Sequence, residues 1–465
     1  MTRRQKTALS VLLAASFTLA VDFSILNVAL PAIGADVGFT LENLQWIATA
    51  FSLCAAGFTL LFGRVADLAG RRRMFFIGMA LLCAASLAGG LALDPALLIL
   101  ARVGQGIATA IVVPSALALL LGSFPEGRLR EKALGLNGSL MAAGFTAGAI
   151  LGGLLTDLLS WRWAFFINVP VAVAVLLIAP AVLTESRPSG KTRLDVPGAV
   201  TVTLGLLALV FGLSNAAEHS WTAPLTVVSL LTSLALIVAF VAIERRADSP
   251  LVPLTVLSRP AIAWGNIAGV LAFVTETSLV FLLTLYLQRV LGYSPLGAGL
   301  SFAVLGLGTV LGGILGPKVI ARAGNKRAIV YGFIVQALAT GVLVLLTPSA
   351  ASLALLLIAS FIGGAANLVV IVGFMVTATS GLPDAEQGLA TGLATMSQQI
   401  GITMGIPVMS AIFTAQLLAA GTSDAPAVLH GVIVAIWVNA GLCLVTALLV
   451  AVFLRRPAPE TRRAA

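Results

Sequence analysis

The sequence has few of the charged residues that soluble enzymes and nucleic-acid-binding proteins carry. Only 10% of its 465 residues are charged, 59% are hydrophobic and the mean hydropathy is +1.07. Soluble domains average about 25% charged residues, so the composition excludes a chain built from soluble domains. The net charge of +9 is compatible with nucleic acid. However, the charges lie between long apolar stretches, which favours a membrane protein and predicts no nucleic-acid partner.

Histidine and cysteine are also scarce. The two histidines, His219 and His430, fall in short connections between apolar stretches. The three cysteines, Cys54, Cys83 and Cys443, lie within apolar stretches, and no two have the spacing of a metal-binding pair. The predicted spans therefore lack the histidines for a Ser-His-Asp site or a histidine-bound metal within the membrane, and the cysteines form no disulfide framework. We expect no metal, no cofactor and no enzymatic activity.

What the sequence has instead is a series of long apolar runs. A helix that crosses a bilayer needs about 20 apolar residues, and the runs separated by charged residues or by Pro and Gly number fourteen. The first run is too long for a signal peptide and has no cleavage site of small residues. The predicted spans cover residues 8–30, 46–63, 74–92, 96–121, 133–156, 163–183, 196–214, 222–243, 261–287, 296–317, 328–347, 352–379, 387–417 and 430–454.

The basic residues predict the orientation of the chain. If both termini are cytoplasmic, all 27 lysines and arginines fall in cytoplasmic segments except Arg102, Arg162 and Arg289. Lys and Arg in short loops are retained on the cytoplasmic side. Abundant Ala, Leu, Gly and Arg are typical of a GC-rich bacterial coding sequence. We therefore expect a multi-pass protein of the bacterial inner membrane with both termini in the cytoplasm.

A faint internal repeat supports the count of fourteen. The segment GRVADLAGRRRM at 63–74 follows span 2, and a degraded counterpart, GPKVIARAGNKR at 316–327, follows span 10. Spans 1–6 then match spans 9–14, which leaves spans 7 and 8 as an inserted pair. The predicted division is an N-terminal six-helix bundle at 1–185, the inserted pair with its flanking loops at 186–260, a C-terminal six-helix bundle at 261–455 and a tail at 456–465.

Several segments together resemble one family of transporters. They are DFSILNVALP at 22–31, the loop at 63–74, RVGQG at 102–106, WRWAFFINVP at 161–170 and YLQRVLGYSPLGAG at 286–299. Over essentially the whole chain they resemble the major facilitator superfamily, and more narrowly its fourteen-span branch of drug:proton antiporters. The resemblance implies an all-α integral membrane fold of two pseudo-symmetric six-helix bundles plus an inserted helix pair. It also implies multidrug efflux and antibiotic resistance, with amphipathic drugs or metabolites exported in exchange for protons by alternating access.

Ionisable residues within the predicted spans are the strongest functional candidates, since each costs roughly 2.5–3.5 kcal/mol at the centre of a helix. They are Asp22 in span 1, Arg102 in span 4 and Glu276 in span 9. Each also has a structural interpretation: Arg102 could bond to backbone carbonyls, Asp22 could neutralise it, and Glu276 could sit protonated in a helix contact. The resemblance implies that spans 1, 4, 9 and 12 line one central cavity. There Asp22, Arg102, Gln105, Glu276 and Asn367 would meet.

We assign different roles to these candidates. Asp22 is the predicted proton carrier, because it belongs to the segment that matches the family and the positive charge of Arg102 can change its proton affinity. Glu276 is predicted to meet cationic substrates. The expected partners are protons, the bilayer and a small amphipathic substrate, and the sequence indicates no obligate protein partner.

The loop after span 2 is a candidate cytoplasmic gate. Gly63 and Gly70 permit a tight reversal, Asp67 ends span 2, and Arg64 and Arg71 add positive charge. The arginines alone could serve only to fix topology. The resemblance implies that Asp67 helps to latch the two bundles together.

A second acidic loop extends this hypothesis. The loop between spans 12 and 13 has no basic residue but carries Asp384 and Glu386. Under the repeat, we infer that it faces the basic hairpin of the opposite bundle. Since Ala321 replaces the equivalent of Asp67 in the second copy, the predicted latch is asymmetric.

Span 5 carries a series of glycines that permits close approach of another helix. The series consists of Gly135, Gly144, Gly148, Gly152 and Gly153. Its spacing resembles the antiporter signature of the family, which continues with a proline after the third glycine, where this chain has Ala149. A proton-coupled uptake symporter or facilitator for a metabolite therefore remains an alternative. A membrane-embedded enzyme or sensor is disfavoured, because the sequence lacks a catalytic set and a soluble domain.

Overall fold

The computed structural model describes the chain except residues 40–45, 125–127, 186–194, 248–249, 251–255, 257, 380–383, 423 and 455–465. The predicted tail at 456–465 thus lies outside the described residues. The N-terminal half consists of α1 (Arg3–Val37), α2 (Trp46–Ala69), α3 (Arg71–Gly90), α4 (Pro95–Ser123), α5 (Arg128–Leu158), α6 (Trp163–Phe166) and α7 (Asn168–Val182). Then come α8 (Val196–Glu218) and α9 (Pro224–Glu244).

The C-terminal half begins with α11 (Pro260–Leu285), which continues as the π-helical turn η1 (Tyr286–Val290). It is completed by α12 (Pro295–Ala323), α13 (Asn325–Val342) with the 3₁₀ turn η2 (Leu343–Leu345), α14 (Ser352–Thr379), α15 (Asp384–Ala420) and α16 (Ala425–Phe453). Within the described chain, fourteen helical segments are long and apolar enough to cross a membrane. The predicted all-α class and number of spans are confirmed.

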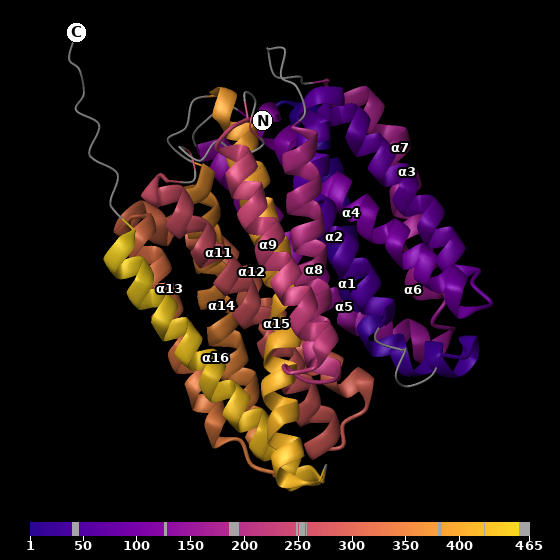
Figure 1. Ribbon diagram of the computed structural model, residues 1–465, viewed down its shortest axis with the longest axis vertical. Coiled ribbons are helices and arrows are strands. Elements are labelled where there is room, and N and C mark those ends of the chain that lie inside the picture. Colours follow the sequence, from indigo (N-terminus) through magenta and orange to yellow (C-terminus); the bar gives the residue numbers. More distant parts are fainter. Residues whose placement is uncertain are drawn as a thin grey trace.

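The two halves lie side by side, and α8 and α9 lie across the seam between them (Figure 1). Helix α8 contacts both α2 and α15. Leu206 of α8 belongs to one apolar cluster with Leu60 of α2 and Leu393 of α15, and the rings of Trp46 and Phe211 lie 5.9 Å apart. The inserted pair therefore packs against both halves instead of standing apart from them.

Close helix crossings hold the N-terminal half together. A Cβ atom on Gly144 of α5 would lie 2.8 Å from the carbonyl oxygen of Phe17, and one on Gly148 would lie 2.7 Å from that of Val21. Gly152 meets α1 in the same way, and Gly153 is buried. Because only glycine permits such an approach of two backbones, these glycines press α5 against α1.

The C-terminal half repeats this crossing. Gly401 and Gly405 of α15 lie against the carbonyl oxygens of Val270 and Val274 of α11. The spacing of four residues is the same on both helices of each pair. The internal repeat is therefore present in the packing, and it equates α1 with α11 and α5 with α15.

Two short loops repeat as well. Gly70, between α2 and α3, has φ +109°, and Gly324, between α12 and α13, has φ +81°. Each is the single residue between two helices, and positive φ favours glycine. We call the end of the molecule that holds these loops, where α1 begins and α16 ends, the basic end.

At the basic end the two halves touch. A Cβ atom on Gly135, the first glycine of the series in α5, would lie 3.7 Å from Cγ of Pro317 in α12. On the other side of the seam, Leu60 of α2 packs with Ala390 and Leu393 of α15. Gly135 thus serves the contact between halves, whereas the later glycines of α5 serve the contact with α1.

We expect Gly148→Ala to destabilise the protein by roughly 1–3 kcal/mol, the usual cost of overpacking. The added methyl group would meet the Val21 backbone and Oγ of Ser24, and backbone atoms cannot turn away. Thermal unfolding of the purified protein in detergent measures the change. Gly138→Ala on the same helix is the control, since nothing lies within 4 Å of its Cβ position. Equal melting temperatures for the two variants would contradict the packing argument.

Candidate functional site

A cavity lies between the two halves, near the middle of their helices. Its wall comes from α1, α2, α4 and α5 on one side and from α11, α14 and α15 on the other. The volume of the cavity is about 90 Å³. A single water needs a cavity of about 10–15 Å³, whereas pockets for drug-sized ligands have volumes of roughly 300–1,000 Å³. In this arrangement the cavity has room for several waters but not for a drug-sized molecule.

The wall from the N-terminal half is mainly aromatic and apolar, and its polar residues are Ser52, Thr109 and Asn137. The ring of Phe23 lies 5.8 Å from that of Phe51 and 5.9 Å from that of Phe145, measured between centroids. These separations are typical of favourable aromatic pairs. Three helices, α1, α2 and α5, thus contribute one ring each to a surface that suits a flat apolar group.

The wall from the C-terminal half is more polar. Glu276 of α11 is partly exposed to the cavity and has no hydrogen bond or ion pair with the described part of the chain. It is also the one Asp, Glu, Lys or Arg among the described lining residues. Nearby, Nε2 of Gln398 lies 3.7 Å from Sδ of Met141 across the seam. The remaining polar groups on this wall are Thr277, Gln399 and Thr403.

Asp22 lies outside the cavity wall, buried within the N-terminal half. Its Oδ1 accepts hydrogen bonds from Nε2 of Gln105 at 2.7 Å and from Nδ2 of Asn168 at 2.5 Å. Both amide groups also donate to Oγ of Ser86, at 3.0 and 3.3 Å. Asp22 is 0% exposed, so α1, α3, α4 and α7 meet in a polar cluster that has no contact with bulk water.

Arg102 completes this cluster but does not close on Asp22. Its Nε donates to the carbonyl oxygen of Ile47 at 2.9 Å, and its Nη1 donates to Oε1 of Gln105 at 2.9 Å. Nη1 lies 3.6 Å from Oδ2 of Asp22, and that oxygen has no hydrogen-bond partner among the described residues. A charge-assisted hydrogen bond is normally about 2.7–2.9 Å long. Arg102 therefore bonds to a backbone carbonyl, as its structural interpretation suggests. It does not form a direct hydrogen bond with Asp22, and we call this longer contact the open ion pair.

The structure does not bring the five candidate cavity residues together. Glu276 lines the cavity, whereas Asp22, Arg102 and Gln105 belong to the buried cluster. Asn367 of α14 lies inside the C-terminal half, where its Nδ2 donates to the carbonyl oxygen of Ala272 at 3.0 Å. The four helices do carry polar groups at one level, but these groups point into three different environments.

A neutral counterpart of the charged cluster occupies the C-terminal half. Nε2 of Gln336 donates to Oγ1 of Thr275 at 3.1 Å, and Nδ2 of Asn439 donates to the Thr275 carbonyl oxygen at 3.0 Å. Nδ2 of Asn367 also lies 3.3 Å from Oε1 of Gln336. The same helices of the repeat therefore meet through amides and hydroxyls, with no charge.

The glycine crossings give the register between the two clusters. Because Val270 and Val274 take the places of Phe17 and Val21, Thr275 takes the place of Asp22. By the same register, Glu276 takes the place of Phe23. Each half thus carries one acid at adjacent positions of the repeat, one inside its bundle and one facing the cavity.

Sequence reasoning missed several members of both clusters. Ser86, Asn168, Gln336 and Asn439 are all fully or nearly fully buried. The available signal was a single Ser, Asn or Gln in an otherwise apolar span. Such residues are common in membrane helices, and only their partners distinguish these four.

The loop at 63–74 is organised by an acid from another loop. Oε1 and Oε2 of Glu185 accept hydrogen bonds from the backbone N–H groups of Arg72 and Arg73, at 3.1 and 3.3 Å. These groups belong to the first turn of α3, which favours negative charge. A Cβ atom on Gly70 would lie 2.8 Å from Cδ of Glu185. Gly70 is thus required both for its positive φ and for the space that Glu185 fills.

Asp67 finds its partner within the same loop. Its Oδ1 lies 2.9 Å from both Nε and Nη2 of Arg71, and both side chains are partly exposed. Gly63 and Arg64 lie within α2, so the prediction that Gly63 forms part of the reversal is wrong. A Cβ atom on Gly63 would lie 3.7 Å from Cβ of Pro114. The side chains of Asp384 and Glu386 lie outside the described part of the structure. A latch between the bundles therefore stays a prediction.

At the end of the molecule opposite the basic end, the segment at 161–163 joins the end of α1 to the loop between α3 and α4. Arg162 pairs with Asp36 at the end of α1, and Nε1 of Trp161 donates to the same carboxylate at 3.0 Å. Nη2 of Arg162 donates to the carbonyl oxygen of Ala92 at 3.1 Å. The hydrogen bonds from Arg162, and secondly from Trp161, lower the pKa of the Asp36 carboxyl. This segment therefore has a structural role.

Comparison with known proteins gives consistent matches over nearly the whole chain. The sequence profile of the Major Facilitator Superfamily matches residues 12–406. The chain is 38% identical to the cephamycin export protein CmcT of Amycolatopsis lactamdurans, over 90% of this chain and 86% of that protein. It is 36% identical to the puromycin resistance protein pur8 of Streptomyces alboniger, over 96% and 90%. The solved human organic anion transporter MFSD10 (TETRAN) shares the fold, with a TM-score of 0.66 at 17% identity over 97% and 100% of the two chains.

We expect Asp36→Asn to lower the melting temperature at neutral pH, because the Arg162 pair is lost. Since the folded-state pKa of Asp36 lies below its usual value of 3.8, the wild-type pair contributes fully above that pH. It is lost only as the pH falls through the lower folded-state pKa. The difference in melting temperature between wild type and variant should therefore be constant near neutral pH and should vanish only in strong acid.

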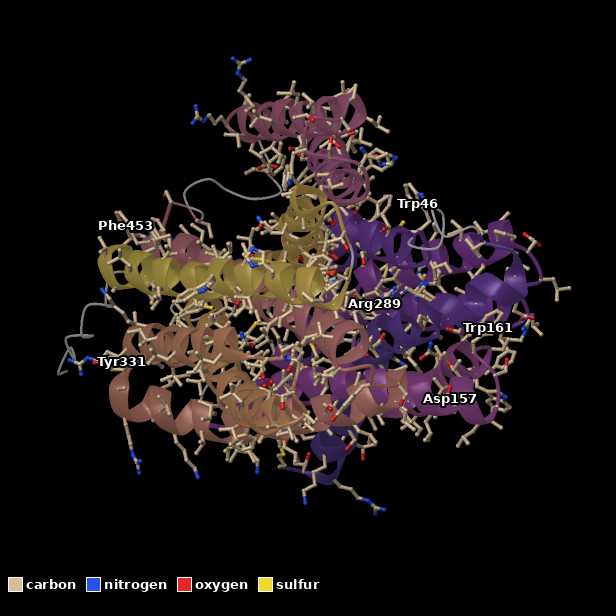
Figure 2. All side chains as sticks on the ribbon, turned by 90° about the horizontal axis from the view of Figure 1, so that it is seen from below. Trp46, Asp157, Trp161, Arg289, Tyr331 and Phe453 are labelled. Carbon is tan, nitrogen blue, oxygen red and sulfur yellow. The ribbon has the colours of Figure 1, made fainter. Side chains whose placement is uncertain are left out.

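Asp157→Asn is the matched control for this test. Asp157 is exposed at the same end and has no hydrogen bond or ion pair with a described residue. Figure 2, seen from this end, shows Asp157 and Trp161 on the same half. A loss of stability in Asp157→Asn as large as in Asp36→Asn would contradict a stabilising role for the Arg162–Asp36 pair.

Proposed function

Because the chain belongs to the Major Facilitator Superfamily and is a membrane transporter, we propose that it exports amphipathic organic compounds in exchange for protons. The cavity would be exposed alternately to the two sides of the membrane by rocking of the two halves. The observation that carries this proposal is the pairing of a cavity that has one aromatic and one acidic wall with a separate, open Asp22–Arg102 ion pair next to it.

The relatives support export over uptake. Two similar proteins are described as a cephamycin export protein and a puromycin resistance protein, and a third, 35% identical over 85% of this chain, as a lincomycin resistance protein of Streptomyces lincolnensis. All three descriptions fit removal of an antibiotic from the cell. The alternative of metabolite uptake rests on Ala149, a single departure from a resemblance, and has no such support.

The proposed orientation places the basic end in the cytoplasm of a bacterial cell, as the basic loops predict. The contacts of Leu60 with Leu393 and of Gly135 with Pro317 then close the cytoplasmic side of the cavity. Opening to the cytoplasm requires both contacts to separate. The Asp67–Arg71 hairpin is the proposed latch that biases this equilibrium, and Asp384 and Glu386 are its expected acidic counterpart.

Asp22 is the proposed proton carrier. In the charged form it attracts Arg102, and in the protonated form it leaves Arg102 to the Ile47 carbonyl and Gln105. The helix that carries Asp22 is pressed against α5 by glycines, and α5 contacts α12 of the other half. A change in the Asp22–Arg102 pair therefore has a short packed route to the interface that has to move.

Glu276 is the proposed site for a cationic group of the substrate. It faces the cavity with no hydrogen bond or ion pair to a described residue, and the rings of Phe23, Phe51 and Phe145 line the same cavity. A compound with an aromatic part and an ammonium group would satisfy both walls. Neutral compounds would use the aromatic wall and the amides alone.

We expect Asp22→Asn to abolish efflux driven by a pH gradient for every substrate while still allowing substrate to bind. The amide keeps the shape of the side chain but cannot carry a proton. Reconstituted vesicles with and without an imposed pH gradient measure transport, and fluorescence or calorimetry measures binding. Asp36→Asn on the same helix is the control and should keep its response to the gradient. Full gradient-driven transport by Asp22→Asn would make Glu276 the carboxylate to test next.

We expect Glu276→Gln to weaken export of cationic compounds by about tenfold or more, which corresponds to about 1.4 kcal/mol or more. Neutral compounds of similar size should be spared, because the substitution keeps side-chain volume and hydrogen bonding. Drug resistance of cells that express each variant, together with binding of a matched cationic and neutral pair, measures this difference. Equal losses for both compounds would contradict a charge-based role.

A further inference from the structure

Phe51 stands between the cavity and the buried charge cluster. Its side chain lines the cavity, and the guanidinium carbon of Arg102 lies 4.3 Å from the centroid of its ring. Phe51 is 1% exposed, and its ring lies between the ring of Phe23 and the guanidinium of Arg102. We propose that Phe51 is the positioning residue through which a bound aromatic substrate acts on the Asp22–Arg102 ion pair. This inference rests on the proposed function and adds to it the residue that couples substrate to proton.

The two members of the ion pair each have an aromatic neighbour at the cavity. Phe23 follows Asp22 directly in α1, and Phe51 lies against Arg102 from α2. The two rings lie 5.8 Å apart. An aromatic group that enters the cavity contacts both rings, and through them it approaches both charges.

The backbone around Phe51 cannot move with its ring. A Cβ atom on Gly106 of α4 would overlap the carbonyl oxygen of Phe51 and would lie 2.8 Å from Cβ of Cys54. One turn earlier, the carbonyl oxygen of Ile47 accepts the hydrogen bond from Nε of Arg102. Because α2 and α4 are in backbone contact here, a substrate that presses on Phe51 turns the side chain and shifts the guanidinium.

The open ion pair makes the cluster sensitive to such a shift. The 3.6 Å separation of Nη1 and Oδ2 exceeds a charge-assisted hydrogen bond by less than about 1 Å. Movement of Arg102 toward Asp22 closes the pair and favours the charged form of the carboxyl, which then releases its proton. By thermodynamic reciprocity, protonation of Asp22 weakens substrate binding by the same factor. Competition of this kind is what exchange of substrate for protons requires.

Arg102 dominates the electrostatic surroundings of Asp22. The groups that face Asp22 from α3, α4 and α7 are Ser86, Gln105 and Asn168, all neutral. Helix α5 meets α1 in this region through its glycines, and α2 contributes the Ile47 carbonyl to Arg102. Within the described structure, Arg102 is the one charged side chain paired with Asp22. A change in the position of Arg102 therefore changes the proton affinity of Asp22.

Proton release on binding of ethidium, an aromatic cation, tests the inference. The full-length protein is purified in detergent, ethidium affinity is measured by fluorescence over a range of pH, and released protons are counted with a pH indicator in weak buffer. Wild type should release a proton and bind ethidium more tightly as the pH rises. Phe51→Leu should bind ethidium roughly two- to tenfold more weakly, release no proton and show an affinity independent of pH.

Phe145→Leu is the matched control. Its ring contacts Phe23 in the same cavity and belongs to α5, away from the Arg102 contact. It should weaken ethidium binding by a similar factor and retain both proton release and pH dependence. Phe51→Tyr, which keeps an aromatic face, should retain both as well. If Phe51→Leu is too unstable to bind ethidium, Phe51→Met removes the ring with a different apolar side chain.

The outcomes distinguish an error in the role of Phe51 from an error in the proposed function. Wild-type proton release in Phe51→Leu or Phe51→Met, or a loss in Phe145→Leu equal to that in Phe51→Leu, would overturn the role of Phe51. Asp22→Asn separates this failure from that of the proposed function. If Asp22→Asn still releases a proton when ethidium binds, Asp22 is not the proton carrier. If Asp22→Asn releases no proton while Phe51→Leu releases as much as wild type, only the role of Phe51 is overturned. Wild type that binds no ethidium would overturn the aromatic wall as a binding surface.

Discussion

A carboxylate in the apolar interior of a membrane protein must find its partners within the protein, since no bulk water can solvate it. Asp22 meets this constraint with hydrogen bonds from two amide groups and with Arg102, whose Nη1 lies 3.6 Å from Oδ2 of Asp22. Four helices of the N-terminal half have to converge to supply these groups. A closer ion pair would favour the charged carboxyl, whereas burial without a charged partner would favour the neutral form. The intermediate geometry leaves two arrangements that differ by a small movement of Arg102.

The convergence of helices depends in turn on small residues. Gly144 and Gly148 bring α5 into backbone contact with α1, and Gly106 does the same for α4 and α2. The same type of crossing recurs in the C-terminal half through Gly401 and Gly405. Because lipid provides no hydrophobic force between helices, close packing has to stabilise the bundle. Under the proposed rocking of the halves, these closely packed pairs would let each half move as one body.

The repeat has diverged where function would require it. Thr275 replaces Asp22 at the equivalent place, and a network of Gln336, Asn367 and Asn439 holds the second half without charge. Glu276, one residue further, faces the cavity where the first half has Phe23. One half therefore has the buried acid and the aromatic wall, and the other has the cavity acid. Two acids in separate environments fit the proposal that the proton and a cationic substrate bind to different residues.

Length and hydropathy alone determined the number of spans and the all-α class, because crossing a bilayer requires a long apolar helix wherever it packs. The loop at 63–74 and its echo at 316–327 also revealed the repeat, since Gly70 and Gly324 are needed for local backbone reasons. Hydropathy does not encode how each helix is rotated. Only the tertiary structure therefore decided that Glu276 faces the cavity, that Asp22 and Arg102 lie behind Phe51, and that Ser86 and Asn168 complete their cluster. Contacts between helices far apart in sequence arise from packing, and a single polar residue in an apolar span carries no information about its partner.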